Sequence, residues 1–167
     1  EERILRYAKQ AKSNVNSKNI IKLKTKIFNS YLKKNKLKLR SGVKEIIKYC
    51  KQQEIKLAFV SSTSKNNINS IFFCLRDSLN KKDFDFIGNS KLVKKLKPSA
   101  EIYKLALKEL RLKPKECIAI EDTQESLNSA LKAKLKCFIF PGKFHRSKKF
   151  NGAFKEISKI NKNILKF

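Results

Sequence analysis

Residues 117–123 read Cys117-Ile118-Ala119-Ile120-Glu121-Asp122-Thr123. The short apolar run, with its β-branched residues, favours a strand buried on both faces, and the polar break after Ile120 marks its carboxyl end. Thr123 is a suitable cap for the next helix, because apolar residues recur at helical spacing over residues 124–133. Glu121 and Asp122 are therefore expected in a strand-to-helix crevice, the place where open α/β sheets bind ligands.

Glu121 and Asp122 are adjacent carboxylates, and two such charges beside an apolar strand repel each other unless a cation or a basic side chain compensates them. Mg²⁺ suits this pair best, because it needs only one or two protein carboxylates and completes its shell with water and phosphate oxygens. The alternative is that both residues are ordinary turn and capping residues on a solvated edge. From these two residues alone, both interpretations stay open.

Outward from this stretch, helical and extended patterns alternate. The predicted order is helix 43–53, strand 57–60, helix 65–75, a short strand near 86–87, helix 99–110, strand 117–120, helix 124–133 and strand 137–140. This alternation predicts an α/β fold with a parallel, Rossmann-like sheet and right-handed crossovers. Residues 4–12 and 18–35 read as helices with no strand between them. We therefore divide the chain into a helical piece, 1–38, and an α/β core, 39–167.

Two other stretches place polar side chains at the start of a predicted helix. Ser61 and Ser62 begin a hydroxyl cluster, residues 61–64, that leads from a strand into a helix whose N-terminus favours an anion. Taken alone, the cluster is better explained by N-capping of the helix by Ser or Thr. Lys97 precedes Pro98, which suits the first turn of helix 99–110. A lysine fixed there can reach a carboxylate pair on the neighbouring strand end.

Composition limits the possible classes of protein. The 167 residues are 41% hydrophobic, enough for one domain with a small appendage, and carry neither a bilayer-spanning apolar run nor a signal peptide. The four cysteines form no CxxC pair, which is typical of buried thiols in a reducing compartment. We expect a cytoplasmic or plastid-stromal protein with no membrane partner. The chain contains no Met, so we expect that residue 1 is not the translation start.

The formal net charge of +27 suggests a nucleic-acid partner when taken alone. However, the 35 Lys and 6 Arg are scattered over nearly every segment instead of gathering on one element. Abundant Lys, Asn and Ile fit an A/T-rich genome, so we predict no specific nucleic-acid partner. A basic field still attracts small phosphorylated substrates at low ionic strength. The sequence carries no signal for an oligomeric state.

Together, Ser61, Lys97-Pro98 and Glu121-Asp122-Thr123 resemble, in order and spacing, motifs two to four of haloacid dehalogenase-like phosphatases. The stretches 39–43, 97–103 and 144–153 are more specifically similar to the CbbY-like branch, which includes xylulose-1,5-bisphosphate phosphatases. The similarity covers most of the chain. One departure is at Ser126 and Lys134, where the family usually has Gly.

The resemblance implies a core with a helical cap inserted after its first strand, and that strand carries an Asp-x-Asp pair. We find no such strand: Asp83-Phe84-Asp85 imitates the pair, but Lys81-Lys82 precede it where an apolar strand is required. The chain is therefore expected to begin inside the cap, to lack its first strand, and to be inactive alone. Because that strand lies mid-sheet, its loss would expose two strand edges, so we expect the isolated chain to aggregate or stay partly molten.

The resemblance also implies individual roles. Ser61 and Ser62 would bind the phosphoryl group, Lys97 would neutralise charge beside the nucleophile, and Asp122, with Glu121 beside it, would hold Mg²⁺. Arg3 would contact the far end of a sugar phosphate. The implied reaction is hydrolysis of a small sugar phosphate through an aspartyl-phosphate. The alternatives are a phosphosugar mutase or phosphoglycolate phosphatase of the same fold, and a basic binding protein without catalysis.

Overall fold

The computed structural model describes residues 2–11, 14, 16–34, 37–143 and 149–166. Its α-helices are Glu2–Gln10 (α1), Ser17–Lys34 (α2), Val43–Gln52 (α3), Lys65–Cys74 (α4), Glu101–Leu110 (α5) and Gln124–Lys132 (α6). Its strands are Ala58–Val60 (β1), Phe86–Gly88 (β2), Ile118–Glu121 (β3), Lys136–Ile139 (β4) and Lys155–Glu156 (β5). The predicted alternation of helices and strands is confirmed, with boundaries that differ by one or two residues.

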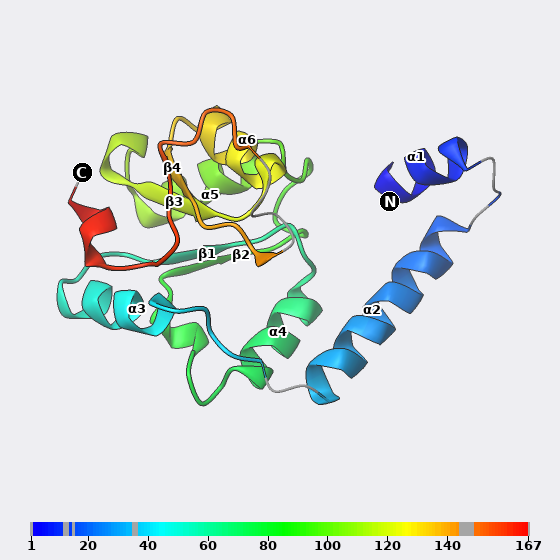
Figure 1. Cartoon of the computed structure of the whole chain (residues 1–167), viewed down its shortest axis with the longest axis horizontal. Coiled ribbons are helices and arrows are strands. Elements are labelled where there is room, and N and C mark those ends of the chain that lie inside the picture. The colour runs from blue at the N-terminus through cyan, green and yellow to red at the C-terminus, as the bar shows by residue number, and fades with distance from the viewer. Residues whose placement is uncertain (1, 12–13, 15, 35–36, 144–148, 167) are drawn as a thin grey trace.

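Within the described residues the strands form two sheets, and every pairing is parallel, so the predicted parallel arrangement is confirmed. β1 pairs with β2, and β4 lies between β3 and β5. β5 was not predicted, because it has only two residues and both are exposed, so it carries no apolar alternation. Figure 1 shows the two sheets side by side, with helices covering them. The fold is α/β with a Rossmann-like arrangement of parallel strands.

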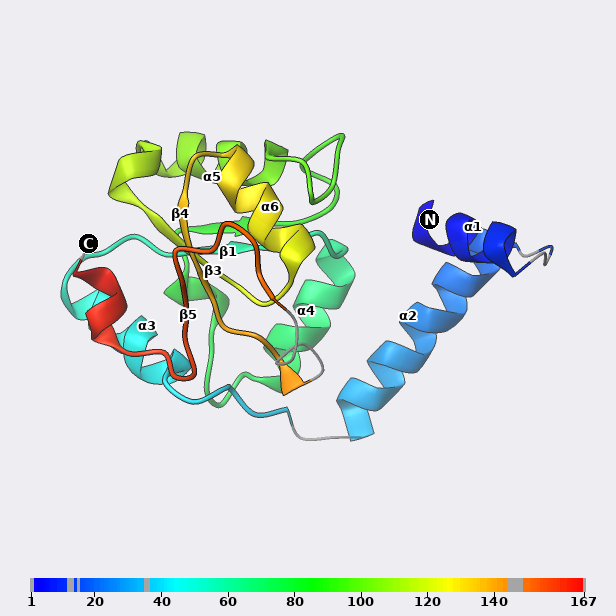
Figure 2. The ribbon, with the colours of Figure 1, turned by 45° about the horizontal axis from the view of Figure 1, so that its top comes forward.

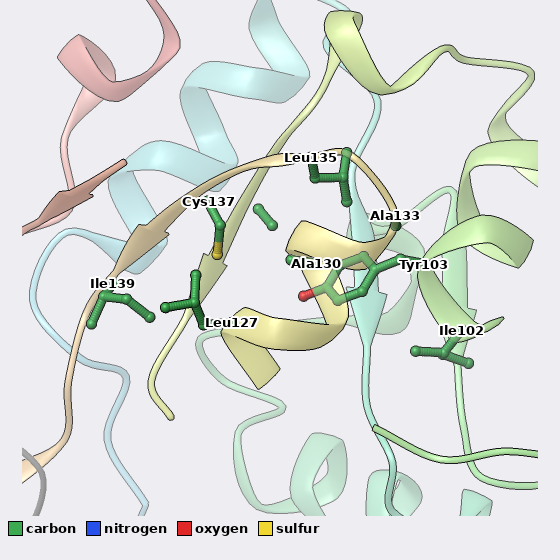
Figure 3. Packing of buried hydrophobic residues seen from close by; sticks show 9 residues of the cluster. Ile102, Tyr103, Leu127, Ala130, Ala133, Leu135, Cys137 and Ile139 are labelled. Carbon is green, nitrogen blue, oxygen red and sulfur yellow. The ribbon is translucent and has the colours of Figure 1, made fainter. Parts of the chain in front are cut away.

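The core lies on both faces of these sheets. α5 packs against β1 and β2, and α6 packs against β3 and β4. Cys137 and Ile139 of β4 contribute to one buried cluster, shown in Figure 3, whereas Phe138 between them packs with Ile46 and Cys50 of α3. The alternation of side chains along β4 therefore serves two cores, which explains why this strand is apolar at successive positions.

The N-terminal helices lie to one side of the sheets (Figures 1 and 2). α2 packs against α4, with Leu32 buried, while Leu23, Ile27 and Tyr31 remain exposed. Their arrangement is compatible with a partial cap. The division at residue 38 stays a prediction.

A groove of about 950 Å³ separates the two sheets, between β1 and β3. The carbonyl of Leu57 and the N–H of Ser61 bond to the β2 side, so the backbone groups of Ala58 and Val60 point the other way, into the groove. The carbonyl of Glu121 bonds to the β4 side, so the backbone groups of Ile118 and Ile120 likewise point into the groove. In the described part of the chain, no strand pairs with either of these edges.

The open groove leads to a prediction about the chain in solution. Two unpaired strand edges and an apolar lining favour self-association and incomplete packing. The isolated 167-residue chain is therefore expected to bind a dye specific for exposed apolar surface, to elute as mixed oligomers, and to lose its helical circular dichroism gradually on heating. A sharp, cooperative thermal transition from a monomer would contradict this expectation.

Candidate active site

Lys97 lies just before α5 and is only 8% exposed. Its Nζ donates to the carbonyl of Val60 at 3.2 Å and to Oε1 of Glu121, so the predicted contact with the carboxylate pair is confirmed. Pro98 does not lie in the first turn of α5, because that helix begins later, at Glu101. The Glu101 carboxylate instead accepts the backbone N–H groups of residues 94 and 95 and so holds the loop that carries Lys97.

The two carboxylates after the buried run differ in environment. β3 extends through Glu121, one residue beyond the predicted end, and the side chain of Glu121 is 11% exposed and paired with Lys97. Asp122 follows β3 and is exposed. Thr123 caps α6 by accepting the N–H of Ser126, so helix capping does not account for the two carboxylates.

Tyr103 of α5 is a site residue that the sequence analysis missed. Its hydroxyl donates to Oε1 of Glu121, the same oxygen that accepts from Lys97. Burial, and then the charge of Glu121, hold the pKa of the Tyr103 phenol well above its ordinary value. In the sequence, Tyr103 is one of the apolar positions of α5, so nothing there distinguishes it from a core residue.

The residues of the hydroxyl cluster, 61–64, have different hydrogen-bond partners. Ser64 caps α4 by accepting the N–H of Asn67, so capping belongs to Ser64. Ser61 is half-buried, and its Oγ accepts the N–H of Thr63, which leaves its O–H as a donor. Ser62 accepts the backbone N–H of Lys97 at 3.2 Å. The structure therefore brings Ser61 and Ser62 to the place where Lys97 lies.

Arg40 is a second residue whose position the residue patterns did not predict. Its guanidinium donates to the carbonyls of Phe140 and Pro141 at 2.5 and 2.8 Å and lies 3.3 Å from the centre of the Phe140 ring. Arg40 lines a small hollow of about 220 Å³ together with Glu121 and Asp122. The segment that follows α2 is thus attached to the end of β4, beside the carboxylates.

Two predicted features lie elsewhere. Arg3 belongs to α1, which Figure 1 shows apart from the strands, but its side chain lies outside the described residues, so its role stays a prediction. Residues 144–148 of the family-like stretch also lie outside them.

Asp83 pairs with Lys51 at 2.8 Å, and Asp85 accepts the N–H of Leu57, so both have structural partners. This agrees with the interpretation that Asp83-Phe84-Asp85 only imitates the motif.

The arrangement at the groove's mouth suits a phosphorylated ligand. A buried ammonium and a serine hydroxyl can neutralise and bind phosphoryl oxygens, and the N-terminus of α4 adds its positive dipole. Asp122 and the second oxygen of Glu121 fit Mg²⁺, which takes few protein carboxylates. Within the described ranges, no group of three His, Cys, Asp or Glu residues could hold a metal by itself.

Known proteins resemble this chain closely. CbbY of Cereibacter sphaeroides is 32% identical over 151 residues, which cover 90% of this chain and 66% of that protein. The CBBY-like protein of Arabidopsis thaliana is 26% identical and matched over 41% of its length. The chain therefore spans less than two thirds of these relatives.

A solved structure agrees with these sequence matches. CbbY from Rhodobacter sphaeroides, in complex with xylulose-1,5-bisphosphate, superposes with a TM-score of 0.85 at 30% identity, over 95% of this chain and 72% of that one. The family model described as haloacid dehalogenase-like hydrolase matches residues 2–140. On this agreement of sequence, fold and family model, the chain belongs to the haloacid dehalogenase-like hydrolase family.

Proposed function

We propose that this chain is the larger part of a Mg²⁺-dependent phosphatase that acts on a small sugar phosphate of the xylulose-1,5-bisphosphate kind. The single observation that carries the proposal is the contact of Lys97 with Val60 and Glu121, two strand-end residues that line the groove and are followed in the chain by Ser61 and Asp122. Phosphoryl transfer needs mainly positioning and neutralisation of charge on the phosphoryl oxygens, and these residue types provide both.

In this proposal the reaction takes two displacements. The first aspartate of the Asp-x-Asp pair attacks phosphorus through a carboxylate oxygen, the bond to the sugar oxygen breaks, and the second aspartic acid of the pair gives that oxygen a proton. The second aspartate then takes a proton from a water molecule, which attacks the aspartyl-phosphate and releases phosphate. Lys97 neutralises the nucleophile's charge, and Ser61 donates to a phosphoryl oxygen. Asp122, with Glu121 beside it, holds Mg²⁺, which when bound supplies further neutralisation of phosphoryl charge.

The nucleophile is assigned to a strand that fills the groove between β1 and β3. In the described residues, neither edge of the groove pairs with another strand. Lys97 contacts Val60 at the end of β1, so its ammonium would lie near the residue that follows a strand in the groove. The strand proposed for the groove would have about six residues, a common length for strands in globular proteins. Its Asp-x-Asp ending would place one carboxylate next to the ammonium.

The proposed location of the protein rests on its cysteines. All four are free, which supports a reducing compartment, and we propose the cytoplasm or the plastid stroma. Separately, no helix in the described part of the chain is long and apolar enough to cross a membrane.

The first prediction concerns Asp122. When the coding sequence is extended upstream to include an apolar strand ending in Asp-x-Asp, the protein is expected to release phosphate from xylulose-1,5-bisphosphate in a Mg²⁺-dependent manner. Asp122→Ala should lower the rate by about 100-fold or more, because it removes a carboxylate that holds the metal. Phosphate release is the measurement, and isomer formation without release would indicate a mutase instead.

Asp77→Ala is the matched control, because Asp77 is an exposed aspartate of the segment after α4. It should leave the rate unchanged. Phosphate release that survives Asp122→Ala undiminished would refute the proposed metal site. Tight nucleic-acid binding at physiological salt, with no phosphatase activity, would favour the basic binding protein.

The second prediction concerns the groove. A synthetic peptide of about nine residues, six of them apolar and β-branched and followed by Asp-x-Asp, should bind the isolated chain and sharpen its thermal transition, because it pairs both open edges. Calorimetry and circular dichroism would measure binding and melting. A peptide of the same composition in scrambled order is the control for non-specific apolar binding.

A chain variant tests the same contact from the other side. Ala58→Pro removes an N–H that faces the groove and leaves the β1–β2 pairing in place, so it should weaken binding of the ordered peptide about tenfold or more. Equal binding of ordered and scrambled peptides, or equal binding by the Ala58→Pro variant, would count against a strand in the groove.

A further inference from the structure

The hydroxyl of Tyr103 contacts the paired carboxylate from within the core. Tyr103 is 6% exposed and belongs to the cluster formed by α5, α6, β3 and β4. Figure 3 shows its ring among Leu127, Ala130 and Cys137, with the hydroxyl oxygen directed away from α5. That hydroxyl donates to Oε1 of Glu121. A rigid core residue thus holds a charged group at the mouth of the groove.

Oε1 of Glu121 receives both hydrogen bonds. Lys97 and Tyr103 donate to this same oxygen, and the side chains of Lys97 and Glu121 are 6% and 11% exposed. A carboxylate held by one donor can turn about its last torsion, but two donors from different elements fix its plane. Glu121 is therefore oriented by Tyr103, and the Lys97 ammonium is held in turn.

The ring of Tyr103 has a separate effect. The Lys97 ammonium lies 4.9 Å from the ring centre, within the range of a cation–π contact. Tyr103→Phe preserves this contact and the packing in the core, and removes only the O–H donor. The hydrogen bond is therefore separable by experiment from burial and ring packing.

We propose that Tyr103 is a positioning residue, whose hydroxyl fixes the Glu121 carboxylate and, through it, holds Lys97 at the carboxyl end of β1. The relevance of this contact to phosphoryl transfer rests on the proposed function, since Lys97 neutralises charge only if it stays in place. The contact also leaves the second oxygen of Glu121 and the carboxylate of Asp122 available to bind a cation.

The test measures Lys97 directly and needs no activity. Trace acetylation of the protein extended upstream as above, followed by mass spectrometry, gives the reactivity of each lysine. Lys97 should react roughly tenfold more slowly than Lys51, whose ion pair is exposed, because a buried amine reacts only after local opening. In Tyr103→Phe, Lys97 should react several-fold faster, and Lys51 should not change.

Two further variants test whether Tyr103 acts on Lys97 through Glu121. Tyr49→Phe removes a hydroxyl from another part of the core and should leave the Lys97 reactivity unchanged. Glu121→Gln should raise the Lys97 reactivity, and adding Tyr103→Phe to it should raise it no further, because Tyr103 acts through Glu121. If Tyr103→Phe does not fold, Glu121→Gln examines the same contact from its other partner, and an unchanged Lys97 reactivity there would overturn the proposal.

Further results would decide whether Tyr103 positions Lys97. An unchanged Lys97 reactivity in folded Tyr103→Phe, or an additive effect in the double variant, would overturn the proposal. In the extended, active protein, Tyr103→Phe should lower kcat with little change in KM, since the lost contact matters most in the transition state. Absence of phosphatase activity would reject the proposed function, while the acetylation result would still decide whether Tyr103 holds Lys97.

Discussion

The contact of Lys97 with two strand ends is the interaction on which the site depends. Its ammonium donates to the carbonyl of Val60 at the end of β1 and to Glu121 at the end of β3, so it bridges the two sheets. In the described part of the chain, these sheets share no hydrogen-bonded strand. The same bridge therefore connects the sheets and fixes a positive charge at the mouth of the groove.

The charge of Lys97 lies in a different environment from most of the charges that make up the formal net charge of +27. Most lysines are exposed, and charges in water are screened within about 8 Å at physiological salt. Lys97 is buried, so its interactions are less screened, and its desolvation cost is offset only by close partners. The carbonyl, the Glu121 carboxylate and the Tyr103 ring are those partners. The local field of the site thus comes from one buried lysine and not from the overall composition.

Residue patterns predicted the elements because helices and strands are local. Within the described residues, the periodicities predicted all of the α-helices and four of the five strands, and the sequence also predicted the contact of Lys97 with Glu121. Tyr103 was missed, because its role depends on where α5 crosses β3, which spacing does not reveal. β5 was missed because two exposed residues carry no pattern. Lys134 has a φ of 63°, a left-handed conformation that Gly adopts without strain, which fits the expectation of Gly at this position that came from the family resemblance.

The pairing of Glu121 also separates the two carboxylates by task. A carboxylate whose one oxygen already accepts from an ammonium and a phenol has part of its charge compensated, and only its other oxygen remains for a cation. Asp122 is exposed, so both its oxygens are accessible to a hydrated ion. Under the proposed function, direct binding of Mg²⁺ would therefore fall to Asp122, while the structure shows Glu121 paired with Lys97. Adjacent carboxylates that seem equivalent in the sequence become unequal because only one of them faces a buried lysine.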